Sequence, residues 1–194
     1  MSFVISACRS ELLQAWVNLS GRDARALKAE AQLLDMYGKQ IDVREAEIVS
    51  DEDTTVECFD IEIPEDVTDV YYIKLTLTEG ERLVSENFYW EGKETGNWKA
   101  LRNLPQADVK VTTSLAEGEV WKGEVKLENT SDVPALMIRV KLAGKDGSLI
   151  LPVMYSDNYF FLMPGESKTV SVEFNDFDLA GRKPQIEVSG FNVK

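Results

Sequence analysis

Hydrophobic and polar residues alternate along most of the chain. The clearest case is the stretch 72–78, where apolar side chains occupy every second position. This period of two predicts β-strands with one buried face. The expected inward residues are Ile73, Leu75 and Leu77, and the expected outward residues are Lys74, Thr76 and Thr78. Similar alternation marks the stretches 109–111, 123–127, 137–142 and 169–174. Turn residues separate the stretches at Glu79-Gly80, Gly144-Lys145-Asp146-Gly147 and Pro164-Gly165, which is typical of a β-sandwich or barrel.

The stretch 55–63 alternates with one break. Val56, Ile61 and Ile63 share a face only if the phase slips by one residue near Cys58 or Phe59. A slip of one residue is what a β-bulge produces. We therefore predict a strand with a bulge in its middle.

The stretch 23–37 carries two conflicting signals. Its content of Ala, Leu, Lys and Glu favours a helix by intrinsic propensity. Its apolar residues, however, alternate with Lys28, Glu30 and Gln32, which is a strand pattern. An internal repeat favours the second interpretation, and we predict a strand through Leu27, Ala29, Ala31 and Leu33.

The chain repeats itself once. Three segments of its first half have counterparts at similar spacing in the second: 16–20 with 127–131, 35–39 with 146–148, and 53–56 with 167–170. Each copy contains a strand, an Asn-x-Ser turn, a strand, a Gly turn, a long loop and a Thr-Val strand. Two copies of one Greek-key sandwich account for the length. We predict an all-β chain of two tandem immunoglobulin-like β-sandwiches, at 1–92 and 101–194, with a linker at 93–100.

Composition and charge narrow the classes of partner. The chain has 194 residues, 44% of them hydrophobic, which is enough for globular cores. Its formal net charge of −13 argues against nucleic acid and against an anionic membrane surface. It contains no apolar run of about 18 residues that would span a bilayer. Its first residues lack the positive region of a signal peptide, so none is expected here.

The cysteine and histidine contents narrow the chemistry. Cys8 and Cys58 do not imply a disulfide framework in a chain of this length, and we expect both to act as small buried hydrophobes. The chain has no histidine, which excludes Ser-His and Cys-His nucleophile systems and removes the commonest zinc ligand. Nothing singles out a catalytic pair among its 34 acidic residues. We therefore predict no catalytic residue, no metal site and no cofactor.

Two kinds of polar motif have alternative interpretations. Asn18-Leu19-Ser20 and Asn129-Thr130-Ser131 match the N-glycosylation pattern, but their equivalent positions in both repeats favour a turn role. The Asp-rich turns at 146–147, 156–158 and 175–178 offer oxygen ligands for calcium. Because none has the EF-hand spacing, we expect their Asp and Asn side chains to shape turns, and calcium stays an open alternative.

Aromatic residues gather at two places. Trp90 closes the first repeat and Trp98 lies in the expected linker. Tyr155 and Tyr159 flank the pair Asp157 and Asn158. Sugar rings stack on exposed aromatic side chains beside carboxylates or amides, so these residues are candidates for carbohydrate or interdomain contact. The alternative is that they pack a core or a domain seam, because Tyr and Trp bury a large area. An apolar docking patch is expected near 155–161 or 90–98.

Two segments resemble a known family. Phe88-Tyr89-Trp90, followed by Leu101-Arg102-Asn103-Leu104-Pro105, resembles the junction between the last two domains of family 2 glycoside hydrolases. The stretch 150–160, continuing into 162–167, is similar to the segment LPV(F/Y)(W/Y)SDNY(F)xLxPGES of the exo-β-glucosaminidase and β-mannosidase type. Arg139 fits the same pattern. The resemblance is strong from about Val70 to the end and weak before it.

The resemblance implies a role beside a catalytic domain. Such enzymes combine a sugar-binding-like β-domain, an immunoglobulin-like domain, a catalytic TIM barrel and two further immunoglobulin-like domains. Their catalytic glutamates lie on the barrel, so no catalytic residue carries over to this chain. We expect a non-catalytic accessory pair from the C-terminus of a retaining exo-glycosidase acting on β-linked glucosamine or mannose. Its expected partner is the TIM barrel of a bacterial, exported parent chain. The alternative is an autonomous carbohydrate-binding module that uses exposed aromatics to bind an oligosaccharide.

Overall fold

The computed structural model describes residues 2–9, 13–20, 25–50 and 55–194. The chain divides into two compact units, Met1–Asn103 and Leu104–Lys194. The strands of the first unit are β1 (Ser2–Arg9), β2 (Leu13–Ser20), β3 (Arg25–Asp35), β4 (Gln40–Ser50), β5 (Thr55–Ile61), β6 (Val70–Glu79) and β7 (Arg82–Gly92). A 3-10 helix, η1 (Lys99–Asn103), follows them.

The second unit is also built of strands. They are β8 (Val109–Ala116), β9 (Val120–Asn129), β10 (Ala135–Gly144), β11 (Met154–Tyr155), β12 (Phe160–Leu162), β13 (Ser167–Asn175) and β14 (Pro184–Ser189). One short helix, α1 (Asp176–Leu179), lies between β13 and β14. The all-β prediction is confirmed for the described residues.

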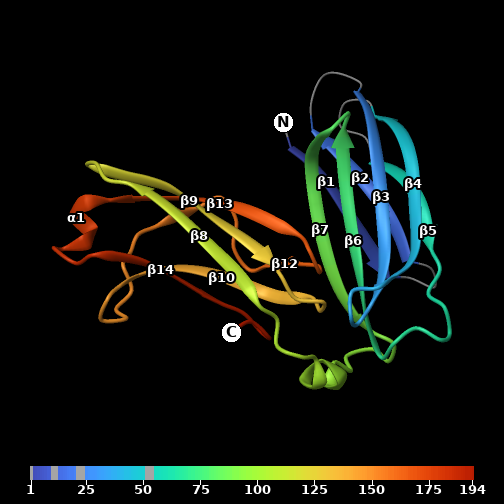
Figure 1. Cartoon of the computed structure of the whole chain (residues 1–194). Helices are drawn as coiled ribbons and strands as arrows, with labels where there is room; N and C mark the ends of the chain where they lie inside the picture. The colour runs from blue at the N-terminus through green and yellow to red at the C-terminus, as the bar shows by residue number, and fades with distance from the viewer. Residues whose placement is uncertain (1, 10–12, 21–24, 51–54) are drawn as a thin grey trace. The chain divides into compact units, whose positions relative to one another are not determined.

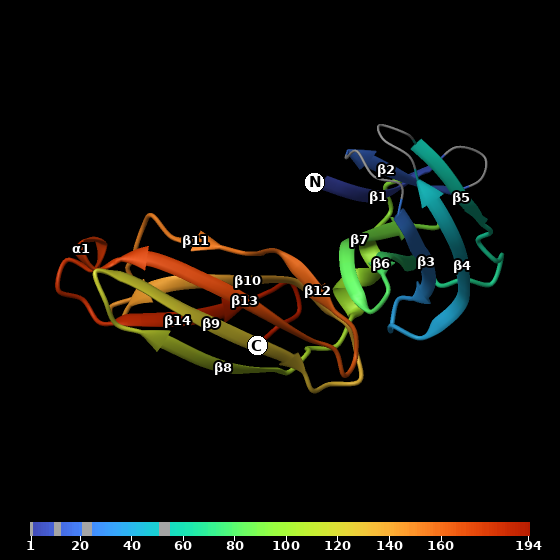
Figure 2. The same ribbon diagram turned by 90° about the horizontal axis from the view of Figure 1, so that it is seen from above.

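Each unit is a sandwich of two antiparallel sheets (Figures 1 and 2). The first unit has the sheets β1-β2-β5 and β4-β3-β6-β7, and the second has β11-β13-β9-β8 and β12-β10-β14. The predicted repeat is therefore present as topology: β2 pairs with β5 in one unit as β9 pairs with β13 in the other. Asp53 and Thr54, which belong to one repeated segment, lie outside the described residues.

The repeat also extends to one turn. In the first unit Asp35 N donates to Lys39 O at 2.9 Å and Gly38 N donates to Asp35 O at 3.0 Å. In the second, Gly144 N donates to Ser148 O at 2.8 Å and Gly147 N donates to Gly144 O at 2.9 Å. Gly38 and Gly147 have φ values of 84° and 78°, which an L side chain rarely adopts. The same backbone turn, with glycine at the same position, thus closes the same strand in both units.

The cores lie between the sheets of each unit, as the alternation predicts. Ile73, Leu75 and Leu77 of β6 are each fully buried. The first core contains Leu27, Ala29, Ala31, Leu33, Ile48, Ile61, Val67, Tyr71, Ile73, Leu75 and Leu77. The second contains Ala107, Val125, Leu127, Val133, Ala135, Ile138, Val140, Leu142, Ile150, Phe160, Leu162, Val170, Val172, Phe174 and Leu179.

The two irregular stretches of the first unit behave as predicted. The stretch with mixed signals forms β3, and Leu27, Ala29, Ala31 and Leu33 all point into the core. Burial of that face outweighs the helix propensity of its alanines, which is a weak preference per residue. In β5 the pairing with β2 skips Cys58, because Ala15 faces Phe59 and Trp16 faces Glu57. This skipped residue is the predicted bulge.

Cys58 is half-buried against the first core, and its Sγ lies 3.8 Å from Val56 O. The side chain of Cys8 lies outside the described residues. Strand β2 lies between β1, which carries Cys8, and β5. Strands two apart in a sheet are separated by about 10 Å, which exceeds the roughly 7 Å Cα limit for a disulfide. We therefore expect no bond between these two cysteines.

We predict that Cys58 reacts slowly with alkylating agents. Burial, and to a lesser degree the neighbouring Glu57 carboxylate, raise the pKa of the Cys58 thiol. The reactive thiolate is thus scarcer than in a free cysteine at any given pH, and alkylation should reach half its maximal rate above the ordinary thiol pKa of about 8.5. Peptide-resolved mass spectrometry after iodoacetamide pulses across pH measures this. A midpoint at or below that of free cysteine would contradict the expected burial.

Candidate functional site

The Tyr155–Tyr159 group lies where the chain of the second unit crosses from one sheet to the other. Strand β11 pairs with β13, and β12 pairs with β10 in the opposite sheet. We call residues 154–162 the crossing segment. Its first aromatic, Tyr155, packs against the core and accepts a hydrogen bond from Leu142 N at 2.8 Å through its hydroxyl. Burial raises the pKa of this hydroxyl, and the bond from Leu142 opposes the rise in part.

Ser156 and Asn158 continue this bonding to both sheets. Ser156 N donates to Ser171 O at 3.0 Å, and Ser171 N donates to Ser156 Oγ at 2.9 Å, which attaches the segment to β13. The Asn158 side-chain amide forms two hydrogen bonds with the backbone of Val140 in β10. Val140 N donates to Asn158 Oδ1 at 2.8 Å, and Asn158 Nδ2 donates to Val140 O at 2.9 Å. The side chains thereby satisfy backbone groups that would otherwise lack a partner at the crossing.

Asp157 and Tyr159 face outward from the same segment. Asp157 Oδ1 accepts from Asn158 N at 2.7 Å, and its Oδ2 forms an ion pair with Lys168 Nζ at 2.5 Å. This pair is partly exposed and contributes about 0–1 kcal/mol. Tyr159 is 52% exposed, its φ is 60°, and its ring lies 5.9 Å from the Arg139 guanidinium. Of this group, Tyr159 offers the most accessible aromatic surface.

Trp90 and Trp98 lie in the first unit. Trp90 is half-buried on β7, where it pairs in register with Tyr72 of β6. Trp98 is 47% exposed and precedes η1, where its carbonyl accepts from Leu101 N at 3.2 Å. Each of the two tryptophans thus has its own surroundings within the first unit. Carbohydrate or interdomain contact by these residues stays a prediction.

We predict that Tyr155→Phe destabilises the second unit by about 1–2 kcal/mol. The change removes the acceptor for Leu142 N and leaves that donor half-buried, a loss in the usual range for one hydrogen bond. Tyr159→Ala is the control, because an exposed ring contributes little and its change should stay within about 0.5 kcal/mol. Urea unfolding compares them. Equal effects of the two variants would contradict the anchoring role of the Tyr155 hydroxyl.

Asn129 has the turn role that the repeat suggested. Its side chain is fully buried, its Nδ2 donates to Val133 O at 2.8 Å and to Leu162 O at 2.9 Å, and its Oδ1 accepts from Ser131 N and Oγ. A glycan needs an accessible amide nitrogen, which this residue does not present. The equivalent Asn18 lies in β2, and its side chain lies outside the described residues.

A second buried asparagine escaped the sequence analysis. Asn192 is 2% exposed, its Oδ1 accepts from Leu136 N at 3.0 Å, and its Nδ2 donates to Pro105 O and Pro134 O. It thus fixes the end of the chain to two loops of the second unit. Its partners lie 56 to 87 positions away, so no local pattern marks it.

In the Asp-rich turns, aspartate carboxylates accept hydrogen bonds from nearby donors. Asp146 Oδ1 accepts from Ser148 N at 3.1 Å and from Ser148 Oγ at 2.7 Å, and these bonds lower the pKa of Asp146. Asp178 Oδ2 accepts from Asn175 Nδ2 at 3.1 Å. Among the described residues no three acidic or cysteine side chains come together as a metal-binding group. Within that same part of the chain, no helix is long and apolar enough to cross a bilayer.

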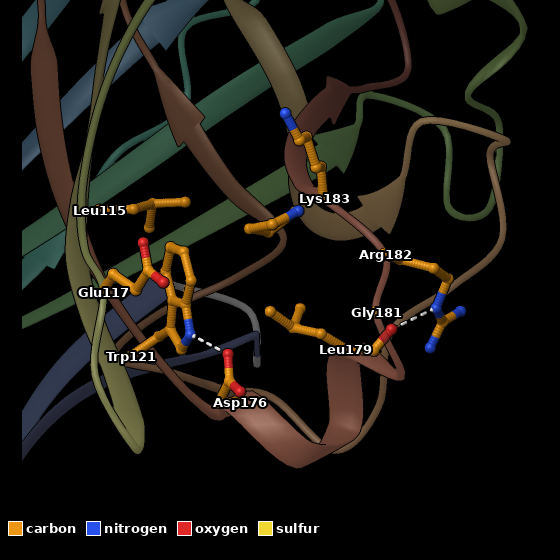
Figure 3. Close-up of a pocket in the computed structure, with 9 residues that line it drawn as sticks. Leu115, Glu117, Trp121, Asp176, Leu179, Gly181, Arg182 and Lys183 are labelled. Atoms are coloured by element: carbon orange, nitrogen blue, oxygen red, sulfur yellow. Dashed lines mark hydrogen bonds between the residues drawn. The ribbon is translucent and has the colours of Figure 1, made fainter.

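A pocket that the sequence analysis missed lies in the second unit, near the β8–β9 turn (Figure 3). Its volume is about 500 Å³. It is lined by Leu115, Glu117, Trp121, Asp176, Leu179, Gly181, Arg182, Lys183 and Pro184. The lining residues come from the β8–β9 hairpin and from the α1–β14 connection, which are about 60 positions apart. The one sequence signal was the Asp-rich turn at 175–178, which supplies Asp176.

Comparison with known proteins gives two family matches that together span most of the chain. Residues 87–193, more than half of the chain, match the family described as the exo-β-D-glucosaminidase Ig-fold domain. Residues 11–93 match the mannosidase Ig/CBM-like domain. These matches confirm that the two sandwiches are immunoglobulin-like.

Curated relatives and solved structures agree with these families. An exo-β-D-glucosaminidase of Hypocrea jecorina is 31% identical and matches 93% of this chain. One of Amycolatopsis orientalis is 32% identical over 63% of the chain. The crystal structure of an Amycolatopsis orientalis exo-chitosanase superposes on 98% of the chain with a TM-score of 0.90 and 23% identity. A β-D-mannosidase of Dictyoglomus thermophilum superposes with a TM-score of 0.70 and 15% identity.

The chain spans a small share of these proteins. It covers 23% and 14% of the two curated relatives, and 26% and 22% of the two solved chains. The relatives therefore contain much more than the region that matches this chain.

Proposed function

We propose, on the premise that this chain belongs to the exo-β-D-glucosaminidase Ig-fold domain family, that it is the accessory, non-catalytic C-terminal pair of sandwiches of a family 2 glycoside hydrolase. The bond-breaking carboxylates lie on a TIM barrel of the same polypeptide, a retaining exo-glycosidase that is exported. The substrate class is β-linked glucosamine, with β-linked mannose as the alternative suggested by the match of residues 11–93 to a mannosidase domain.

The observation that carries this proposal is that polar side chains of the crossing segment form hydrogen bonds within the fold. The crossing segment contains the most specific motif of the chain, and its Tyr155, Ser156 and Asn158 bond to β10 and β13 rather than facing a ligand. The chain has no histidine, and within the segment the Asp157 carboxylate is engaged in a surface ion pair and the Tyr155 hydroxyl in a hydrogen bond from Leu142 N. These are the properties of a scaffold.

Two exposed apolar side chains support a docking role. Leu151, which precedes the crossing segment, is 66% exposed, and Met154, the first residue of that segment, is 73% exposed. Exposed apolar side chains mark contact surfaces when they form a patch, and these two lie three positions apart in the sequence. We propose that this part of the second unit contacts the catalytic domain.

The test compares the polypeptide that carries these residues with a version from which they are deleted. We expect the shortened enzyme to inactivate faster on heating, because a packed neighbour is lost, while freshly folded molecules still hydrolyse a chromogenic β-D-glucosaminide. Unchanged heat inactivation would contradict the docking role. Loss of hydrolysis in a demonstrably folded barrel would contradict the non-catalytic role.

A second candidate is an autonomous carbohydrate-binding module that uses exposed aromatics. The exposure of Tyr159 beside Arg139, and of Trp98, favours it. Calorimetric titration with chitosan and mannan oligosaccharides separates the two candidates. Heat that vanishes on Tyr159→Ala supports the module, and heat that survives this change rules out the Tyr159 surface as its site.

A further inference from the structure

The pocket beside Trp121 has the size of a small-molecule site. Its volume of about 500 Å³ lies within the roughly 300–1,000 Å³ of typical ligand pockets. Asp176 N donates to Glu119 O at 3.0 Å, which holds the beginning of α1 against the β8–β9 turn. The two walls of the pocket are thus fixed to each other by a backbone bond.

Trp121 is held in one orientation by two contacts. Its Nε1 donates to Asp176 Oδ1 at 2.8 Å, and its ring stacks on Phe174 with centroids 5.6 Å apart and planes at 17°. Figure 3 shows its indole facing the space that Leu179 borders on the other side. A fixed indole in a partly apolar pocket suits a ligand with a flat apolar face, because the side chain loses little conformational freedom on binding.

The charges that line the pocket are divided, with Glu117 and Asp176 near Trp121 and Arg182 and Lys183 on the opposite side (Figure 3). Arg182 already donates to the carbonyls of Leu179, Leu149 and Asp178 and to Ser148 Oγ, so its guanidinium is engaged in the fold. The side chain of Lys183 lies across the pocket from Trp121 (Figure 3). Glu117 and Asp176 remain as exposed carboxylates on the Trp121 side. These two carboxylates, together with the formal net charge of −13 on the whole chain, favour a cationic ligand near Trp121.

We propose that this pocket binds a β-linked amino sugar whose amine is protonated. The axial C–H groups of a β-linked pyranose form an apolar face that packs against Trp121, and the ammonium group lies near Glu117 and Asp176. The assignment rests on the proposed function for its setting beside a glycosidase, and on the pocket's own charge and shape for its ligand. It is distinct from the Tyr159 surface.

The test is a two-dimensional NMR titration of the whole chain with the β-1,4-linked glucosamine tetramer. Trp121→Phe identifies the Trp121 indole signal. We expect a saturable shift of that signal, and an affinity for the glucosamine tetramer at least about threefold above that for the N-acetylglucosamine tetramer and for cellotetraose, which lack the positive charge. Glu117→Gln and Asp176→Asn should each weaken binding about threefold. The second variant keeps an oxygen acceptor for the indole.

Two control variants locate the effect. Tyr159→Ala alters the exposed aromatic of the crossing segment, and Asp132→Asn removes an exposed carboxylate beyond the far end of β9. Both should leave the affinity unchanged. No shift at Trp121, equal affinity for the three tetramers, or loss of binding in Tyr159→Ala would each overturn the proposal. None of these results bears on the deletion test of the accessory role, and that test does not involve sugar binding by the isolated chain.

Discussion

Asn129→Asp is expected to destabilise the second unit by about 4 kcal/mol at neutral pH. The replacement has the same shape, but it offers no donor to Val133 O and Leu162 O, which the amide now bonds at 2.8 and 2.9 Å. A carboxylate would instead face two carbonyl oxygens in a fully buried position. Both the lost bonds and the buried charge oppose folding.

The pH dependence of this variant has a definite sign. Burial against carbonyls raises the folded-state pKa of the introduced carboxyl above its unfolded value of about 3.9. The unfolded chain then ionises more readily, so the destabilisation grows as the pH rises above about 4 and is smallest below it. Urea unfolding at pH 4 and pH 7, with hydrogen exchange to identify the unit, measures the difference. Asn103→Asp, at an exposed position, is the matched control. Equal losses in the two variants would contradict the burial of Asn129.

Leu75→Ala is expected to destabilise the first unit by about 3 kcal/mol. Leu75 is fully buried in the middle of β6, between Ala31 of β3 and Asn87 of β7 in register. Truncation removes apolar area from the core and leaves a cavity that the rigid sheet cannot fill. The first unit should lose this stability in urea unfolding.

Val49→Ala is the control for this prediction. Val49 is 70% exposed on β4, so its truncation should change the stability by no more than about 0.5 kcal/mol. Hydrogen exchange of the β6 amides reports the same comparison residue by residue. Equal protection of these amides in the two variants would mean that the inward face of β6 is wrongly assigned.

The strands were predictable because their signal is local. Ile73, Leu75 and Leu77 alternate with polar residues over a single strand, and burial of every second residue follows directly from the pleat. The stretch through Leu27 and Leu33 shows the limit of propensity, because its composition favours a helix while the spacing of its apolar residues decides for a strand. The repeat supplied independent support there.

The role of the crossing segment was not predictable from local patterns. Tyr155 and Asn158 look like surface aromatics and turn formers in the sequence, yet their hydrogen-bond partners in β10 lie 13 and 18 positions away. Only the folded arrangement reveals that the two side chains satisfy backbone groups of β10. A specific sequence motif can therefore reflect a structural requirement as well as a ligand.

The pocket beside Trp121 was missed for a related reason. Trp121 is the second residue of β9, an ordinary alternating strand, and Asp176 belongs to a turn that suggested calcium or a turn role. They meet because β9 and β13 pair along their full length, with Trp121 opposite Phe174. Convergence of distant segments of this kind follows from register, which the sequence alone does not specify at this distance.

Hydrolysis of a chromogenic β-D-glucosaminide by the isolated 194-residue chain tests the central claim most directly. The account predicts product release equal to that of the heat-denatured chain at every substrate concentration, because it places the bond-breaking carboxylates on another domain of the parent polypeptide. Saturable turnover by the folded chain, abolished by replacing one of its own carboxylates, would contradict it.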